Sequence, residues 1–206
     1  MEDREVIEQV LGGDNDAFGL LVEKYQTKVY NLALRMCGNE DDAFDLAQEA
    51  FVRTWRNLGS FQFESSFSTW LFRLSSNICL DFLRAKKRRA AVSLTVTDDE
   101  DDEETQLAVP DPGKTPEEAV IAAEDRALLT RALNELPADQ RQILTLRAIN
   151  DLSYAEIAEI LHLQEGTVKS RLSRARTALR NKLLQIGNKS ISDSSVNQKG
   201  GMRDGL

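Results

Sequence analysis

The sequence predicts an all-α protein with two small helical domains joined by a flexible acidic linker, the C-terminal domain containing a helix-turn-helix. Apolar residues recur at helical spacing almost throughout, except in the middle and at the end of the chain, and no strand-like alternation persists. A chain of 206 residues can bury one good core or two small ones. The acidic stretch in the middle of the chain favours two small cores, because it separates two regions of helical pattern.

The N-terminal domain is expected over residues 1–90. Its three helices are expected over residues 16–36, about 42–57 and about 67–84. Gly38 and Asn39 follow the first apolar stripe and are typical of a helix end. The third helix leads into the basic cluster KKRR at 86–89.

The second of these helices has an apolar side and a polar side. The apolar side, expected to be buried, consists of Phe44, Ala47, Phe51 and Trp55. The polar side consists of Asp45, Gln48, Glu49, Val52 and Arg56, with Val52 in its centre. A lone exposed valine is common on protein surfaces, but a polar face with an apolar centre is also typical of a small protein docking site. The residues alone leave both interpretations open.

The third helix carries a strip that suits single-stranded nucleic acid. It consists of Trp70, Arg73, Asn77, Asp81 and Arg84, and it continues into Lys86 and Lys87. Phe61 and Phe63, in the loop before the helix, extend the same platform. Rings stack on exposed bases, amides read base edges and cations follow the backbone. The alternative is that Trp70 and the two phenylalanines are simply core residues.

Residues 91–114 are expected to form the linker. Residues 95–125 contain twelve acidic side chains and one basic side chain, which gives this segment a net charge of −11. Since the whole chain carries −8, the remainder carries +3, so the acidic balance does not argue against nucleic-acid binding by the two domains. A segment of this composition buries too little apolar surface to fold alone.

The C-terminal domain is expected over residues 115–186. It begins with a capping threonine, Thr115, and a proline in the first helical turn, Pro116. The polar, glycine-containing segment 187–206 is expected to be a disordered tail.

A helix-turn-helix is expected within this second domain. Ser153 and Glu156 form a capping box that starts its first helix. Ala158, His162 and Val168 stand at the offsets where the two helices approach and the chain reverses. Histidine at the turn is acceptable because it tolerates a positive φ better than most residues.

The second helix of this motif has a basic outward face with no acid from residue 167 to residue 182. Small polar groups in its middle suit base edges, and long cations on its flanks suit phosphates on both walls of a DNA major groove. The residues concerned are Thr167, Lys169, Ser170, Arg171, Ser173, Arg174 and Arg176. The alternative is an ordinary helical hairpin with a solvated basic face.

Other functional classes find little support. One histidine, no glycine-rich phosphate loop and no paired ligand motif argue against an enzyme, a metal site or a cofactor. The acids Glu40, Asp41 and Asp42 suit the positive end of a helix dipole. Cys37 and Cys79 have no close cysteine partner and are expected to be buried in a reducing cytoplasm. No apolar run reaches the length of about eighteen residues that a membrane span needs, so no membrane insertion is expected.

Three motifs in this order resemble the bacterial RNA polymerase sigma factors, specifically the extracytoplasmic-function (ECF) group. The motifs are DDAFDLAQEAFVRTWRN, FSTWLFRLSSNICLDFLRAKKRR and LPADQRQILTLRAINDLSYAEIAEILHLQEGTVKSRLSRAR. The resemblance covers most of residues 10–185. It implies a protein that binds core polymerase, directs it to specific promoters and assists their opening, in the setting of a stress response.

The resemblance also implies roles for the faces described above. Asp45, Gln48, Glu49 and Arg53, together with Val52 and Arg56 on the same side, would dock against the clamp of the largest polymerase subunit. Trp70, Arg73, Asn77 and Arg84 would lie at the downstream (minus-10) promoter element. Lys169, Ser170, Arg171, Ser173 and Arg174 would lie at the upstream (minus-35) element. An anti-sigma factor is an expected partner, and the alternative function is a helix-turn-helix regulator that does not act as a polymerase subunit.

Overall fold

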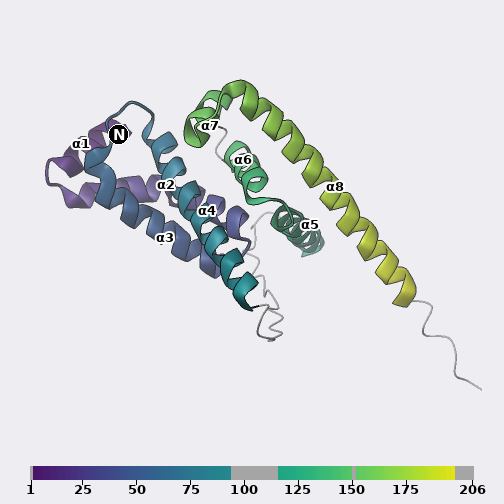
Figure 1. Ribbon diagram of the computed structural model, residues 1–206. Helices are drawn as coiled ribbons and strands as arrows, with labels where there is room; N and C mark the ends of the chain where they lie inside the picture. Colours follow the sequence, from purple (N-terminus) through teal and green to yellow (C-terminus); the bar gives the residue numbers. More distant parts are fainter. Residues whose placement is uncertain (1, 94–115, 150–151, 198–206) are drawn as a thin grey trace, which may run out of the picture.

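The computed structural model describes residues 2–93, 116–149 and 152–197, and helices make up nearly all of these ranges (Figure 1). No strand occurs within them, which confirms the predicted all-α class. The α-helices are α1 (Asp3–Leu11), α2 (Phe18–Cys37), α3 (Glu40–Asn57), α4 (Phe67–Ser93), α5 (Pro116–Asn134), α6 (Ala138–Ile149), α7 (Tyr154–Leu161) and α8 (Glu165–Asn197). Two short 3-10 turns, η1 (Asn15–Ala17) and η2 (Leu58–Ser60), join them. The predicted linker lies outside the described residues from residue 94 onward.

Helices α2 and α3 form a hairpin whose turn follows the predicted signals. Gly38 ends α2 in the left-handed region, at φ 76°, where a residue without a Cβ is least strained. Asn39 then caps α3, since the Asp42 backbone N–H donates to Asn39 Oδ1 at 2.9 Å. Helix α4 packs against both arms of this hairpin, and the three helices enclose the N-terminal part of the core.

The buried side of α3 differs from the predicted one. Phe44 and Trp55 are 58% and 39% exposed, and only Ala47 of the predicted stripe is buried. The residues that face the core are Ala43, Leu46, Ala47, Ala50 and Thr54. Mostly small side chains at these positions let α2 and α4 approach α3 closely, which leaves the larger aromatic rings on the flank.

Helix α1 lies outside the predicted elements and packs on α2 through Val6, Ile7 and Val10. Its start carries a capping box between Glu2 and Glu5. Lys24 and Tyr25 of α2 both donate hydrogen bonds to the Asp3 carboxylate. Helix α1 is therefore joined to the bundle by apolar contacts along its length and by polar contacts at its start.

Helices α7 and α8 form the predicted helix-turn-helix. Ser153 and Glu156 make the expected capping box, and His162 ends α7 in the left-handed region at φ 51°. Helix α8 runs on to Asn197, beyond the predicted end at residue 186. A single glycine such as Gly187 costs a helix only about 1 kcal/mol relative to alanine, so it does not have to end one. Residues 198–206 lie outside the described ranges.

The N-terminal and C-terminal helices pack directly against each other (Figure 1). Helix α6 lies against α2, and α7 lies against α4. The buried apolar cluster continues across this contact, from Leu32 and Met36 of α2 to Ile143 and Leu146 of α6.

Candidate nucleic-acid interface

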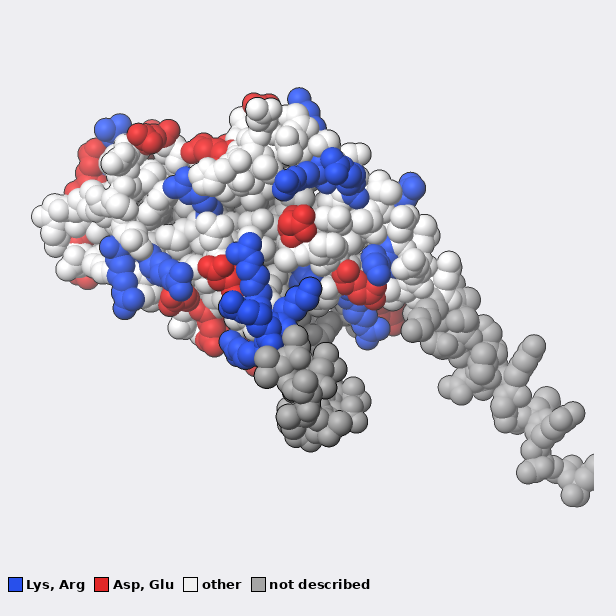
Figure 2. Space-filling view, in the orientation of Figure 1, with Lys and Arg blue, Asp and Glu red and all other residues white. Residues whose placement is uncertain are grey.

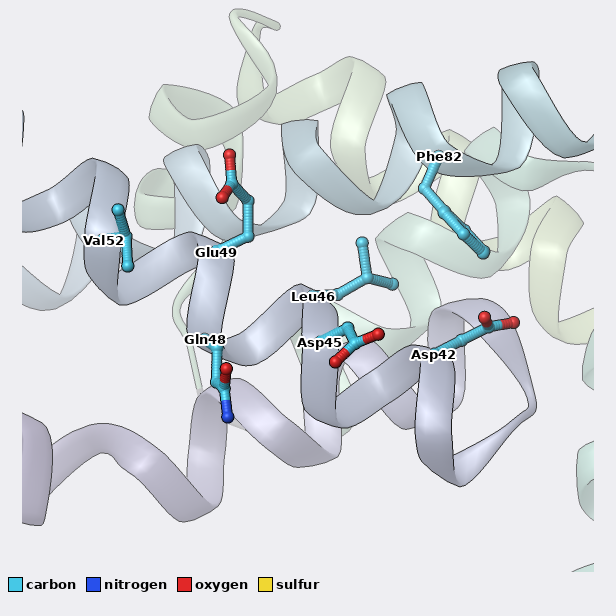
Figure 3. A pocket seen from close by; sticks show the side chains of 7 residues that line it. All are labelled: Asp42, Asp45, Leu46, Gln48, Glu49, Val52 and Phe82. Atoms are coloured by element: carbon cyan, nitrogen blue, oxygen red, sulfur yellow. The ribbon is translucent and has the colours of Figure 1, made fainter.

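The polar face of α3 borders a shallow hollow between α3 and α4. Its volume is about 390 Å³, and its lining residues are Asp42, Asp45, Leu46, Gln48, Glu49, Val52 and Phe82 (Figure 3). Phe82 comes from α4 and the other six come from α3. Three carboxylates around an apolar floor give the hollow the character of a site for a basic and partly apolar partner.

The predicted polymerase-binding residues lie together along this face. Asp45, Gln48, Arg53 and Arg56 are exposed, Glu49 is half-buried and Val52 is 42% exposed. Arg53 Nε donates to Glu49 Oε1 at 2.6 Å, which fixes both side chains along the edge of the face. The Val52 side chain is thus an apolar centre with charged neighbours.

The strip predicted on α4 forms a continuous surface. Trp70 and Arg73 are half-buried, while Asn77 and Arg84 are exposed. Arg84 Nη1 pairs with Asp81 Oδ1 of the same strip at 3.1 Å. Figure 2 shows lysine and arginine side chains gathered over the end of α4, where the basic cluster lies.

The two lysines predicted to extend the strip lie at the end of this surface. Lys87 is exposed, and Lys86 Nζ pairs with Asp42 Oδ2 of α3 at 3.2 Å. The Lys86 ammonium also lies 5.8 Å from the centre of the Phe82 ring. Lys86 therefore borders the hollow on α3 as well as the strip on α4.

Phe61 and Phe63 belong to an aromatic cluster at the start of α4. The Phe61 ring centroid lies 4.8 Å from that of Phe63, 5.3 Å from that of Trp70 and 5.9 Å from that of Phe67. Phe61 is only 7% exposed, so for this ring the core interpretation is the better one. Phe63 and Trp70 keep part of their rings at the surface.

Phe63 has an unusual backbone conformation. Its φ is 57°, in the left-handed region, which is an outlier for a bulky side chain. The Arg4 guanidinium lies over its ring, 4.8 Å from the centroid. Helix α1 therefore reaches the loop that holds the aromatic cluster.

A second hollow of about 390 Å³ opens beside this cluster. One wall comes from α1 and α2, and the other comes from the loop before α4. Its lining residues are Glu2, Asp3, Arg4, Ile7, Lys24, Phe61, Phe63, Ser65, Ser66 and Phe67. Aromatic rings and hydroxyls around one hollow can stack on and hydrogen-bond a base. The two cations of its lining are balanced by the carboxylates of Glu2 and Asp3.

The outward face of α8 has the predicted arrangement. Val168, Leu172 and Ala175 are buried. The exposed residues are Lys169, Ser170, Arg171, Ser173, Arg174 and Arg176, while Thr167 is half-buried. Lys169 Nζ lies 5.6 Å from the centre of the Tyr154 ring of α7, so this cation is held near the turn of the motif.

Several residues of these surfaces were not predicted from the sequence. Arg4, Lys24 and Ser65 line the second hollow, and Phe82 lines the first. The capping box at residue 2 and the apolar spacing of Val6, Ile7 and Val10 would have indicated helix α1. No local pattern indicates that α1 reaches the loop before α4.

The comparisons with known proteins agree with the order of these surfaces along the chain. Residues 21–89 match the family Sigma-70 region 2, and residues 126–179 match the family Sigma-70, region 4. The chain is 41% identical over 180 residues to the ECF RNA polymerase sigma factor SigW of Bacillus subtilis, which covers 87% of this chain and 96% of that protein. The chain belongs to the ECF sigma factors. This confirms the resemblance that the motifs carry.

Two further ECF comparisons support the relationship. This sigma factor is 40% identical over 178 residues to the RNA polymerase sigma-H factor of Pseudomonas aeruginosa, across 86% of this chain and 92% of that protein. It also superimposes on the sigma factor RpoE in the complex with the anti-sigma factor NepR from Bartonella quintana, with a TM-score of 0.64 and 28% identity. That match covers 82% of this chain and 97% of the other.

As an ECF sigma factor, the protein binds core RNA polymerase and directs it to specific promoters. A helix-turn-helix regulator that is not a polymerase subunit is not favoured. Within the described residues, no helix of this sigma factor has both the length and the apolarity of a membrane span. The same residues contain no group of three or more His, Cys, Asp or Glu side chains that could hold a metal ion.

Proposed function

We propose that three helices of this sigma factor have separate roles in transcription initiation. Helix α3 docks against the clamp of the largest polymerase subunit through Val52 and the polar residues around it. Helix α4 binds the minus-10 promoter element, and α8 binds the minus-35 promoter element. The observation that supports this division is that each helix buries one side and exposes a face of the predicted chemistry.

On α4, the strip and the second hollow together trap unstacked bases of the non-template strand. Unpairing and flipping a base costs a few kcal/mol, and stacking on an aromatic ring offsets about 1 to 3 kcal/mol per base. Phe63 and Trp70 supply the partly exposed rings, Asn77 supplies an amide, and Arg73 and Lys87 supply positive charge along the strip. The free energy of binding these bases then opens the promoter, with no covalent step. The protein therefore acts as a stoichiometric factor and not as an enzyme.

On α8, Ser170 and Ser173 approach base edges while Lys169, Arg171 and Arg176 contact phosphates. Arg174 lies in the middle of the exposed face and is long enough to bond a guanine edge with two nitrogens. The phosphate contacts hold the helix in register, and the base contacts select the sequence.

An anti-sigma factor is the proposed regulatory partner, and the cytoplasm is the proposed location. The superimposable RpoE of Bartonella quintana is in complex with its anti-sigma factor NepR. Release from such a partner on stress would make this sigma factor available to polymerase.

Asn77→Ala tests the proposed role of the α4 strip. We expect the variant to bind core polymerase like the parent, because Asn77 lies outside the α3 face, yet to open promoters poorly. Permanganate reactivity of thymines near the start site reports opening, and competition for core polymerase reports affinity. Normal permanganate reactivity with the variant would contradict the proposal, while a general loss of core binding would show a folding defect instead.

A further inference from the structure

Asp81 is an acidic residue on the strip of α4 that is proposed to contact the minus-10 element. It is the only acidic residue between Glu64 and Asp98, a stretch of the sequence that contains six lysine and arginine residues. Its side chain is 69% exposed and lies one turn of helix after Asn77, on the same face. A carboxylate therefore lies within a surface whose other charged members are cations.

Asp81 forms an ion pair with Arg84, one turn further along the helix. Arg84 Nη1 donates to Asp81 Oδ1 at 3.1 Å, and the Arg84 side chain is 67% exposed. Oδ2 of Asp81 has no partner within the described ranges, and a guanidinium has further donors besides Nη1. The pair therefore presents an acceptor and donors side by side at the surface of α4.

The stability of α4 does not account for this acid. An ion pair this exposed contributes little to the free energy of unfolding, because water screens both charges. Aspartate also has a lower helix propensity than alanine, leucine or arginine. Replacing Asp81 should therefore leave the fold nearly unchanged, so we sought its role in what the strip binds.

A carboxylate opposes the binding of DNA unless it meets a hydrogen-bond donor. The phosphates are anionic and repel it whatever the sequence. In the major groove, the donors are the amino groups of cytosine and adenine. Adenine carries the acceptor N7 beside its amino group, which disfavours a carboxylate, whereas cytosine has no acceptor on that edge. Asp81 is therefore suited to cytosine.

Arg84 suits the other half of the same base pair. The guanine that pairs with a cytosine presents two acceptors in the major groove, O6 and N7, and arginine can donate to both. In the base pair, the cytosine amino group lies beside guanine O6, as the Asp81 carboxylate lies beside the Arg84 guanidinium. The hydrogen-bonding groups of the ion pair are thus complementary to the edge of a cytosine–guanine pair.

The position of the ion pair along α4 favours duplex DNA over unstacked bases. Trp70 belongs to the aromatic cluster that is proposed to hold unstacked bases. Asp81 is eleven residues further along the same helix, which is about 16 Å. At that distance from the cluster, we expect Asp81 to lie beside bases that are still paired.

We infer that Asp81 and Arg84 contact one cytosine–guanine base pair at the duplex end of the minus-10 element. Asp81 accepts a hydrogen bond from the cytosine amino group, and Arg84 donates to the guanine. Asp81 is thereby the residue that determines specificity at this position. This inference rests on the proposed binding of α4 to the minus-10 element.

Selection of promoter fragments tests the inference. Duplex fragments randomised across the minus-10 element are selected for binding to holoenzyme with the parent sigma factor, Asp81→Ala or Glu23→Ala. We expect the parent to favour cytosine over thymine at one position by about tenfold or more, and Asp81→Ala to lose that preference alone. Glu23→Ala is the matched control, because it removes an exposed acid of α2 outside the strip and should select like the parent.

Asp81→Asn gives a change that a folding defect cannot produce. An amide can donate to adenine N7 and accept from the adenine amino group, so the preference at this position should move from cytosine toward adenine. In the parent, replacing the selected cytosine by 2-pyrimidinone, which lacks the amino group, should weaken binding about tenfold more than it does in Asp81→Ala.

Three results would overturn the inference. Equal gains in the binding of every fragment by Asp81→Ala would mean that the carboxylate only repels phosphates. Unchanged selection by Asp81→Ala would mean that it contacts no base, and loss of a preference for a base other than cytosine would assign it to a different contact. Failure of the proposed function is distinguishable, because Asn77→Ala would then also leave every minus-10 preference unchanged.

Discussion

At the scale of single residues, Val52 carries the clearest prediction about the polymerase. Val52→Asp should leave stability nearly unchanged, because the side chain is 42% exposed. It should weaken core binding by about tenfold or more, because the interface would then desolvate an unpaired carboxylate. Competition between labelled and unlabelled sigma factor for core polymerase measures the effect.

The control for Val52 is Leu184→Asp, which adds the same charge at a residue that is 58% exposed in the second half of α8. If both variants lose affinity equally, the loss reflects added negative charge and the α3 face is not the docking site.

Cys79 gives a pH dependence to the stability of the fold. Burial raises the pKa of its thiol to about 12, whereas an unfolded cysteine titrates near about 8.5. Below the pKa of the unfolded state, Cys79 keeps its proton in both the folded and the unfolded chain, so its contribution to the free energy of unfolding does not change with pH. Above it the unfolded chain loses the proton first, so the free energy of unfolding falls as pH rises toward the folded pKa, by up to about 1.4 kcal/mol per pH unit.

Urea unfolding at pH 7.5, 9 and 10 should show this decline. In Cys79→Ala, the free energy of unfolding should fall less steeply with pH, even if the variant is less stable at every pH, because alanine has no proton to lose. The same slope in both proteins would mean that other groups, such as the buried Tyr25 hydroxyl, account for the decline.

At the scale of elements, α1 is expected to hold the loop before α4 through Arg4 and Phe63. A cation over a ring at an exposed site contributes about 0.5 to 1 kcal/mol. Arg4→Ala should therefore weaken binding of holoenzyme to a single-stranded minus-10 oligonucleotide by about two- to fivefold. Fluorescence anisotropy measures this affinity.

Glu8 supplies the control, because Arg4 Nε also pairs with Glu8 Oε1 at 3.0 Å. Glu8→Ala removes that ion pair and keeps the contact with Phe63, so it should bind the oligonucleotide normally. A loss as large as that of Arg4→Ala would assign the effect to the stability of α1.

Helix α8 is expected to select sequence through Arg174. Arg174→Ala should cost about 1 to 3 kcal/mol of binding to promoter DNA if the side chain contacts a base with two hydrogen bonds. Binding to scrambled DNA should change much less. Equal losses on both DNAs would assign Arg174 to a phosphate.

The elements also show what the sequence can predict. The helix-turn-helix was predictable because a capping box, a turn residue and an apolar stripe lie within a few residues of one another. The buried side of α3 was predicted wrongly, because large apolar residues were assumed to be inside whereas small ones let the helices approach. Phe44 and Trp55 are exposed for that reason.

At the scale of the whole molecule, the family and the three faces were predictable from motifs that are each continuous in sequence. The hydrogen bond from Arg141 to the Met36 carbonyl was not, because the two residues are 105 positions apart in the sequence and meet only through folding. Nor was the hollow between α1 and the loop before α4, to which α1, α2 and that loop all contribute. Sites made within one helix can be predicted from the sequence, whereas sites made between helices require the structure.

The measurement that tests the account most directly is cleavage of promoter DNA from two positions of the same sigma factor in open complexes. Asp81→Cys and Thr177→Cys place an iron chelate beside the proposed contacts on α4 and α8, and the native cysteines are 1% and 9% exposed and therefore poorly reactive. We expect cuts near the minus-10 element from residue 81 and near the minus-35 element from residue 177, about 25 base pairs apart. Cuts from both positions within about one helical turn of DNA would contradict the account.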